Sequence, residues 1–244
     1  MSPDPSPMAD VVDEGVSILE EARSSGIRLK AVGGLAVRLT CPSATHPALA
    51  RTYKDIDLVG LGKERQDIVA LLSSRGYVPD TEFNTYHGAG RLKFDDTANG
   101  RGLDVFLDRL TMCHELDLRN RLDETALTLD TADLLLSKLQ VVETNERDLK
   151  DAVALLADGG VDQDRVASVL AADWGWWRTS TEVMGKIEAF LGTLPDDPVR
   201  DRAAATLESL ARAIEQRPKS LKWKTRARVG ERVRWYELPD EADV

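Results

Sequence analysis

The chain has 244 residues, enough for one large domain or for a core domain with a helical appendage. Its 42 acidic and 32 basic residues give a net charge of −10, which argues against a general attraction to nucleic acid. No run of about eighteen apolar residues occurs, so we expect no membrane-spanning helix and no membrane partner.

The first ten residues are rich in Pro and lack both the basic start and the apolar core of a signal peptide. We therefore expect a disordered leader over residues 1–10 and a cytoplasmic protein. The two cysteines, Cys41 and Cys113, form no CxxC pair and have no pattern of histidine ligands nearby. They are predicted to be free thiols in a reducing compartment.

Helical and strand-like patterns alternate after the leader. Gly33-Gly34 separates the first strand from a short helix, and Asn99-Gly100 is a strong signal for the tight turn of a hairpin. The expected elements are a helix over 11–24, a strand over 27–32, a helix over 35–39, a strand over 55–60, a helix over 63–74 and hairpin strands over 91–95 and 103–107.

The chain becomes helical beyond Thr131. Helices are expected over 131–142, 146–157, 163–172, 179–191 and 197–216. The pattern therefore predicts an α/β (α+β) protein with a small mixed-sheet core over 11–130, a helical region over 131–216 and a basic tail over 217–244.

Carboxylates lie close to both central strands. If the segment Asp55-Ile56-Asp57-Leu58 is a strand, its two Asp side chains point to one face. Asp104 lies on the second hairpin strand, where Asp108 shares its face and is its main rival. Crowded carboxylates repel one another unless a divalent cation such as Mg²⁺ neutralises them. The pattern indicates metal-assisted phosphoryl chemistry, whereas solvated acids at a strand end are the plain alternative.

The order and spacing of "VGGLAVRL", "RTYKDIDLVG", "LDVFLD", "DLLLSKLQ" and "ERDLKDAVALL" resemble the nucleotidyltransferase fold of the DNA polymerase beta superfamily. The branch that looks most similar is the AbiEii-like and MenT-like one, which includes toxins of toxin–antitoxin systems. The resemblance covers roughly residues 11–158. It implies an enzyme that uses Mg²⁺ and a nucleoside triphosphate (NTP), and it raises the hypothesis of an antitoxin partner.

The resemblance also implies roles for particular residues. Gly33 and Gly34 would hold the triphosphate at a helix N-terminus. Asp55 and Asp57 would bind metal, while Asp104 would contribute to the metal site and activate the attacking hydroxyl.

Three further positions match the branch by context. Arg51 would meet phosphate, Lys138 would steady the triphosphate, and Asp148 matches another acidic position, with Asp151 as an alternative. Each has an ordinary structural interpretation as well, because loop arginines and charges on helix surfaces are common.

The segment from Arg217 to Trp235 carries eight Lys or Arg residues and the single acid Glu231, with Trp223 interleaved. It is predicted either to capture RNA, with tRNA as the most attractive acceptor, or to dock onto the acidic body of its own chain. The alternation over 231–236 suggests a short strand.

The sequence therefore predicts an Mg²⁺-dependent transfer of a nucleoside monophosphate to a hydroxyl acceptor. Two alternatives remain open at this stage. One is a non-catalytic nucleotide-binding or RNA-binding module of the same fold, and the other is a small-molecule nucleotidyltransferase of the antibiotic-modifying type.

Overall fold

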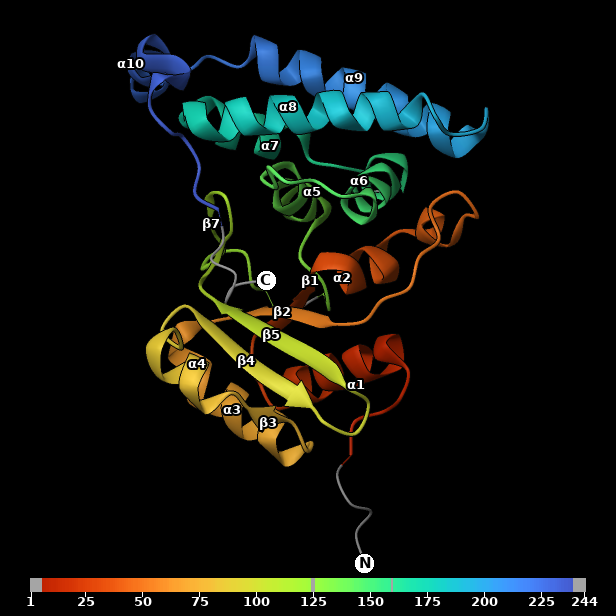
Figure 1. Cartoon of the computed structure of the whole chain (residues 1–244), viewed down its shortest axis with the longest axis vertical. Coiled ribbons are helices and arrows are strands. Elements are labelled where there is room, and N and C mark those ends of the chain that lie inside the picture. Colours follow the sequence, from red (N-terminus) through yellow and green to blue (C-terminus); the bar gives the residue numbers. More distant parts are fainter. Residues whose placement is uncertain (1–5, 124–125, 159, 239–244) are drawn as a thin grey trace, which may run out of the picture. The chain divides into compact units, whose positions relative to one another are not determined.

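The computed structural model describes residues 6–123, 126–158 and 160–238, and the chain divides into two compact units (Figure 1). The sheet unit takes the chain up to Leu39 together with Thr52–Leu110 and Leu116–Leu129. The helical unit takes Thr40–Arg51, Thr111–Glu115 and the chain from Asp130 onward. Half of the expected leader, residues 1–5, lies outside the described residues.

A five-stranded mixed sheet forms the centre of the sheet unit, in the order β1-β2-β5-β4-β3. Only β2 and β5 run parallel, and the other neighbours are antiparallel. The strands are β1 (Leu29–Val32), β2 (Ile56–Gly60), β3 (Val78–Pro79), β4 (Arg91–Asp96) and β5 (Arg101–Leu107). A separate two-stranded sheet pairs β6 (Arg109–Thr111) with β7 (Glu115–Asp117).

Helices accompany this sheet: α1 (Val11–Ser24), α2 (Gly33–Thr40), α3 (Arg65–Ser74) and α4 (Thr81–Tyr86), with a 3₁₀ turn η2 (Gly62–Glu64) before α3. Ile68 of α3 contacts Gly60, whose side of β2 also carries the buried side chains of Ile56 and Leu58. Because side chains alternate along a strand, α3 covers the face of β2 opposite to that of Asp57.

A buried ion pair fixes α1 against the chain that follows α3. Glu14 is fully buried and accepts hydrogen bonds from the Arg75 guanidinium at 3.1 Å and from the Tyr77 hydroxyl at 3.3 Å. Arg75 also donates to Ser17 at 3.0 Å. Burial of a carboxylate is tolerated here because several donors satisfy its oxygens.

The helical unit contains α5 (Thr131–Leu139), α6 (Glu146–Asp158), α7 (Gln163–Ala172), α8 (Trp174–Leu191), α9 (Pro198–Gln216) and α10 (Leu221–Val229), with 3₁₀ turns η1 (Pro42–Thr45) and η3 (Gly230–Arg232). Oxygen-bearing side chains cap most of these helices and accept from backbone N–H groups of the first turn. They are Asp130, Asp162, Asp173, Asp197 and Ser220.

The fold class is α+β, with a mixed sheet and a C-terminal helical region, as the sequence predicts. No helix within the described ranges has the length and apolar character needed to cross a membrane. The elements β3 and α4 were not predicted from the sequence, because both are short. The strand β3 has two residues, one of them Pro79, and α4 has only one buried side chain, that of Phe83.

The start of one helix and the presence of one strand were predicted wrongly in the C-terminal half. The helix expected from Thr179 begins at Trp174, because Asp173 caps it and because Trp174 and Trp176 are buried in its first turn. The strand expected over 231–236 is absent from this described stretch, which forms η3 and irregular chain after α10.

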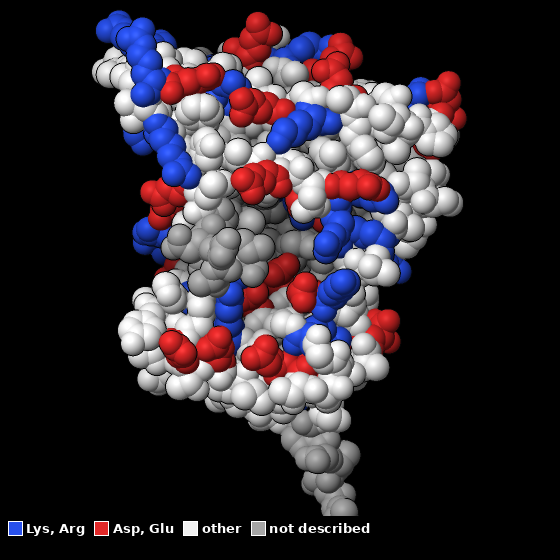
Figure 2. All heavy atoms as spheres, in the orientation of Figure 1, with Lys and Arg blue, Asp and Glu red and all other residues white. Residues whose placement is uncertain are grey.

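The described part of the basic tail packs against α7 and α8 of its own unit. Ser220 N donates to Ala171 O at 3.0 Å, and Lys222 pairs with Asp173 at 3.0 Å. Trp235 donates from Nε1 to Thr179 at 3.2 Å. Lys and Arg side chains gather over α10, where they remain visible at the surface (Figure 2).

A buried ion pair between Asp96 and Arg101 lies at the hairpin that joins β4 to β5. Asp96 is 1 % exposed, and it accepts from Asn99 N at 3.1 Å and from the Arg101 guanidinium at 2.6 Å. Burial alone raises the pKa of Asp96, but the hydrogen bonds from Asn99 and the Arg101 charge together hold it below its usual value. We expect Asp96→Ala to lower the free energy of unfolding by about 3–5 kcal/mol, because Arg101 is left buried without its partner.

The sign of the pH dependence follows from the lowered pKa. The stabilisation by Asp96 is complete above the unfolded pKa of about 4 and is lost as pH falls through the folded value. Denaturant unfolding at several pH values measures the stability lost in Asp96→Ala and how that loss depends on pH. Asp95→Ala is the matched control, because Asp95 is the neighbouring carboxylate and is exposed. A loss no larger than that of Asp95→Ala would contradict the assignment.

Candidate active site in the sheet unit

Two aspartates lie side by side at the centre of the sheet. Asp57 of β2 is the direct register partner of Asp104 of β5, and the two strands are parallel. Register partners in neighbouring strands are about 5 Å apart and point to the same face. Both residues are partly buried. The sheet therefore brings together two of the carboxylates that the sequence singled out.

Asp55 lies one residue before β2, on the same side as Asp57. A methyl group built at Gly102 would lie 3.7 Å from Oδ1 of Asp55, and Gly102 shares its face of β5 with Asp104. Asp55 is exposed. All three predicted acidic residues therefore belong to one face of the sheet.

The glycine turn lies directly against Asp57. Gly33 begins α2 with a φ of +65°, a left-handed conformation that side-chain-bearing residues rarely adopt. A methyl group built there would overlap Oδ2 of Asp57 and lie 3.2 Å from its Cβ and Cγ. Val32, which ends β1, is the register partner of Asp57. Backbone and carboxylate can approach this closely only because residue 33 has no side chain.

Two basic residues on this face, Arg91 and Lys93, were not predicted from the sequence. Arg91 of β4 donates from Nε to Oδ1 of Asp104 at 3.1 Å, and its guanidinium lies 4.8 Å from the ring centre of Phe106. Lys93 is the register partner of Asp104 and lies 4.5 Å from the ring centre of Phe83. The alternation over 91–95 already placed Arg91 and Lys93 on the same face of their strand. The hairpin register, which the sequence does not give, puts that face on the side of Asp104.

Asp108, which the sequence offered as the alternative to Asp104, follows the end of β5 and binds a neighbouring turn. Its φ of +64° breaks the strand, and its Oδ1 accepts from Gly62 N at 3.0 Å. Asp108 N also donates to Gly60 O at 2.9 Å. The carboxylate therefore holds the start of the η2 turn, and strand alternation does not extend to residue 108.

In the described part of the chain, no three His, Cys, Asp or Glu side chains are gathered closely enough to hold a metal ion by themselves. Asp104 is turned toward Arg91, while Asp57 packs against Gly33. The convergence of Asp55, Asp57 and Asp104 on a metal thus stays a prediction. The donor set still suits Mg²⁺, which is commonly bound by one or two carboxylates together with substrate phosphates.

The other three predicted residues belong to the helical unit and form one ion-pair network. Nζ of Lys138 lies 3.0 Å from Asp148 and 2.8 Å from Asp151. Arg51 binds Asp151 through both Nε and Nη2, at 2.9 and 2.8 Å. Burial tends to lower the pKa of Lys138, but the two carboxylates hold it above its usual value.

Both cysteines are free, as expected, and the structure shows that both are buried. Burial raises the pKa of Cys41 to about 12, with Asp158 and Asp151 adding to the effect. The thiol is therefore protonated at neutral pH and is not a reactive nucleophile.

No protein-family model matches the chain, and no curated protein matches it. Among solved structures, the chain is similar to a lincosamide antibiotic adenylyltransferase, LnuA, with lincomycin bound. The TM-score is 0.39 at 15 % identity, covering 57 % of this chain and 92 % of the other.

A second similar structure is the antibiotic-resistance factor ANT(2'')-Ia in solution. Its TM-score is 0.39 at 14 % identity, covering 84 % of this chain and 94 % of the other. At this level of similarity, a function for the chain has to be argued from its own residues.

The Gly33 contact gives a direct test. We expect Gly33→Ala to lower the free energy of unfolding by about 1–3 kcal/mol, because a side chain is strained at positive φ and collides with Asp57. Chemical denaturation measures the loss. Gly90→Ala is the matched control, since a methyl group at Gly90 meets no atom within 4 Å. Equal stability of the two variants would contradict the close approach.

Replacing Asp151 probes the ion-pair network of the helical unit. Asp151→Ala should lower the free energy of unfolding by about 3–5 kcal/mol, because Arg51 loses both hydrogen bonds in a buried site. Glu146→Ala, in the same helix, removes only the exposed partner of Lys150 and should cost less than about 0.5 kcal/mol. Thermal unfolding of both variants distinguishes a buried network from a solvated one.

Proposed function

We propose that this protein is a metal-dependent nucleotidyltransferase. It transfers a nucleoside monophosphate from a nucleoside triphosphate to a hydroxyl-bearing acceptor and releases pyrophosphate. The observation that carries the proposal is the juxtaposition of Asp57 and Asp104 on parallel strands beside the left-handed Gly33 at the start of α2.

Gly33 and Gly34 would bind the triphosphate. The first N–H groups of a helix have no acceptor within the helix, and the helix dipole places partial positive charge at this end. Phosphate oxygens are well matched to such groups. The first turn of α2 contains no acidic side chain that would oppose an anion.

Asp55 and Asp57 would hold Mg²⁺ together with the phosphate oxygens, and Asp104 would complete the metal site. Mg²⁺, when bound, supplies positive charge that offsets the charge of the phosphates. The protein itself contributes mainly placement, because phosphoryl transfer needs little covalent chemistry from side chains.

Asp104 would also accept the proton of the attacking hydroxyl. The acceptor oxygen forms a bond to the α-phosphorus, the bond from that phosphorus to the bridging oxygen of the β-phosphate breaks, and pyrophosphate leaves with that electron pair. Arg91 holds the carboxylate of Asp104 in place through its hydrogen bond. The partly buried side chain of Arg91 places its guanidinium over the ring of Phe106, which limits the movement of both groups.

Arg51, Lys138 and Asp148 are proposed to contribute to nucleotide binding on the sequence resemblance alone. Their network in the helical unit supplies two cations, each already engaged by carboxylates. A phosphate that binds there would have to compete with those ion pairs.

The acceptor is proposed to be either an RNA, such as tRNA, or a small hydroxyl-bearing molecule. The described tail retains exposed basic residues over α10, which favours an anionic acceptor. The names of the two similar solved structures concern antibiotics, and so antibiotics serve as the second class of acceptor to test. An antitoxin partner remains a hypothesis from the resemblance.

The test is transfer of labelled nucleotide by the purified full chain. The reaction contains Mg²⁺, each of the four α-labelled NTPs, and either total tRNA or a panel of lincosamides and other hydroxyl-bearing antibiotics. We expect label on one acceptor class, with EDTA abolishing transfer. Asp57→Asn and Asp104→Asn should each reduce the rate by at least about 100-fold, as expected when a group that stabilises the transition state is removed.

Asp95→Asn is the matched control, because Asp95 is an exposed carboxylate on the neighbouring β4 strand. Its rate should stay within about twofold of the wild type. Transfer that survives Asp57→Asn, or the lack of transfer to every acceptor despite nucleotide binding, would overturn the proposal.

A further inference from the structure

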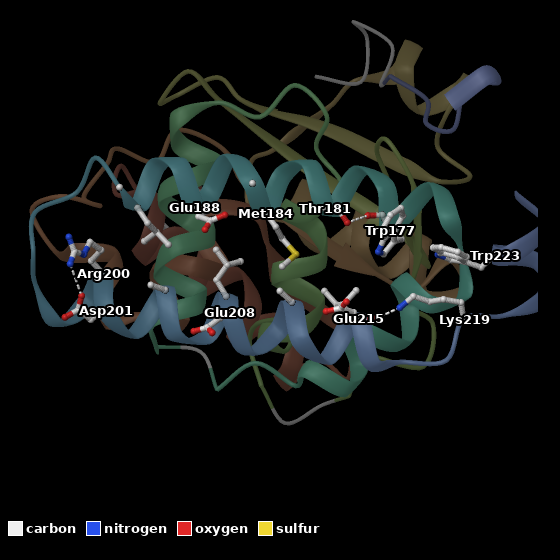
Figure 3. A pocket seen from close by; sticks show the side chains of 17 residues that line it. Trp177, Thr181, Met184, Glu188, Arg200, Asp201, Glu208, Glu215, Lys219 and Trp223 are labelled. Carbon is white, nitrogen blue, oxygen red and sulfur yellow. Dashed lines mark hydrogen bonds and ion pairs between the residues drawn. The ribbon is translucent and has the colours of Figure 1, made fainter. Parts of the chain in front are cut away.

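A long groove runs between α8 and α9 in the helical unit (Figure 3). It has a volume of about 1000 Å³. Its lining on α8 extends from Trp177 to Gly192, and its lining on α9 extends from Arg200 to Glu215. At the end near α10, the rings of Trp177 and Trp223 meet edge to face, with centroids 5.2 Å apart.

Each helix contributes a single stripe to this groove. Lining residues recur at intervals of three and four along both helices, which is the spacing of one helix face. The spacing is seen at Trp177, Thr181, Met184 and Glu188 on α8, and at Ala204 and Glu208 on α9.

Small residues keep the groove open. Ala204 and Ala211 are exposed on α9, and a methyl group built at Gly185 of α8 meets no atom within 4 Å. The lining is also partly apolar, because the buried side chains of Leu191 and Leu207 contribute to it. Paired helices with small residues on facing positions leave room for a third helix to approach closely.

The dimensions favour a helix over a small molecule. The stripe on α8 covers residues 177–192, which at 1.5 Å per residue is about 22 Å. That length corresponds to about four turns of a helix, whereas a compact ligand would fill only part of it. An amphipathic helix buries its apolar face in such a groove by contacts at i, i+3, i+4 and i+7.

The charged residues that line the groove between α8 and α9 favour a basic helix as its occupant. Carboxylates outnumber cations along the groove: exposed Glu188 on α8 and Glu208 and Glu215 on α9 line it together with Asp201, against Arg200 and Lys219 (Figure 3). Glu208 also pairs with Arg212 on its own helix. A guest helix with Lys or Arg flanking its apolar face would meet these carboxylates, while an acidic guest would be repelled. A second copy of this chain is a poor match overall, because the chain carries a net charge of −10.

We propose that the groove between α8 and α9 binds a basic amphipathic helix of a partner protein. The proposal does not rest on nucleotide transfer, since no residue that lines the groove is assigned a role in that reaction.

Selection from a peptide library tests the proposal. The library displays amphipathic helices of about 18 residues, with Leu fixed on one face and Lys or Glu encoded equally at the remaining positions. The target is the full-length protein. We expect selected peptides to carry Lys in clear excess over Glu. Glu208→Lys should weaken the binding of a selected synthetic peptide by about tenfold.

Ala204→Arg and Ala205→Arg form a matched pair, because both alanines are exposed on α9 and only Ala204 lines the groove. Ala204→Arg should weaken peptide binding by at least about tenfold, as expected when the centre of an interface is blocked, and Ala205→Arg by less than about twofold. Circular dichroism and thermal unfolding confirm that both variants fold.

Three results would overturn the proposal. The first is that no selected peptide distinguishes Ala204→Arg from Ala205→Arg. The second is an equal frequency of Lys and Glu among the selected peptides. The third is self-association of the protein that Ala204→Arg abolishes, which would assign the groove to a second copy.

Discussion

The close approach of the Gly33 backbone to the carboxylate of Asp57 constrains the whole sheet unit. Val32 and Asp57 are register partners, so the chain leaving β1 must turn within one residue to avoid the Asp57 side chain. A left-handed glycine makes this turn and starts α2 in the same step. As a result, an acidic group lies beside the positive end of a helix dipole, where a cation and a phosphate can be bound next to each other.

The parallel pairing of β2 with β5 adds the second carboxylate. It is the only parallel pair in the five-stranded sheet as described, and it places Asp104 directly beside Asp57. Two adjacent carboxylates repel each other, and the structure offsets this by the hydrogen bond from Arg91 to Asp104. Asp57 therefore packs against the N-terminus of α2, whereas Asp104 is held by Arg91.

Sequence patterns predicted much of this arrangement, because they report local periodicity and turn chemistry. Gly33, Asn99-Gly100 and the alternation of β5 are local signals, and they located the turn, the hairpin and Asp104. The cations Arg91 and Lys93 were missed, because their position opposite Asp104 depends on hairpin register. Asp108 was kept as a rival since alternation assumes an unbroken strand, whereas its left-handed φ ends β5. The strand expected over 231–236 is replaced by η3 and irregular chain, and α10 was not predicted because its basic residues recur at every second position, which does not match the period of a helix.

The most direct measurement is a crystal structure of the protein with Mn²⁺ and a non-hydrolysable nucleoside triphosphate, because the anomalous signal of Mn²⁺ distinguishes the metal from water and other light atoms. The account predicts a Mn²⁺ peak within coordination distance of Asp57, with triphosphate oxygens against the backbone N–H groups of Gly33 and Gly34. A nucleotide bound elsewhere, or a Mn²⁺ peak that has no ligand among Asp55, Asp57 and Asp104, would contradict it.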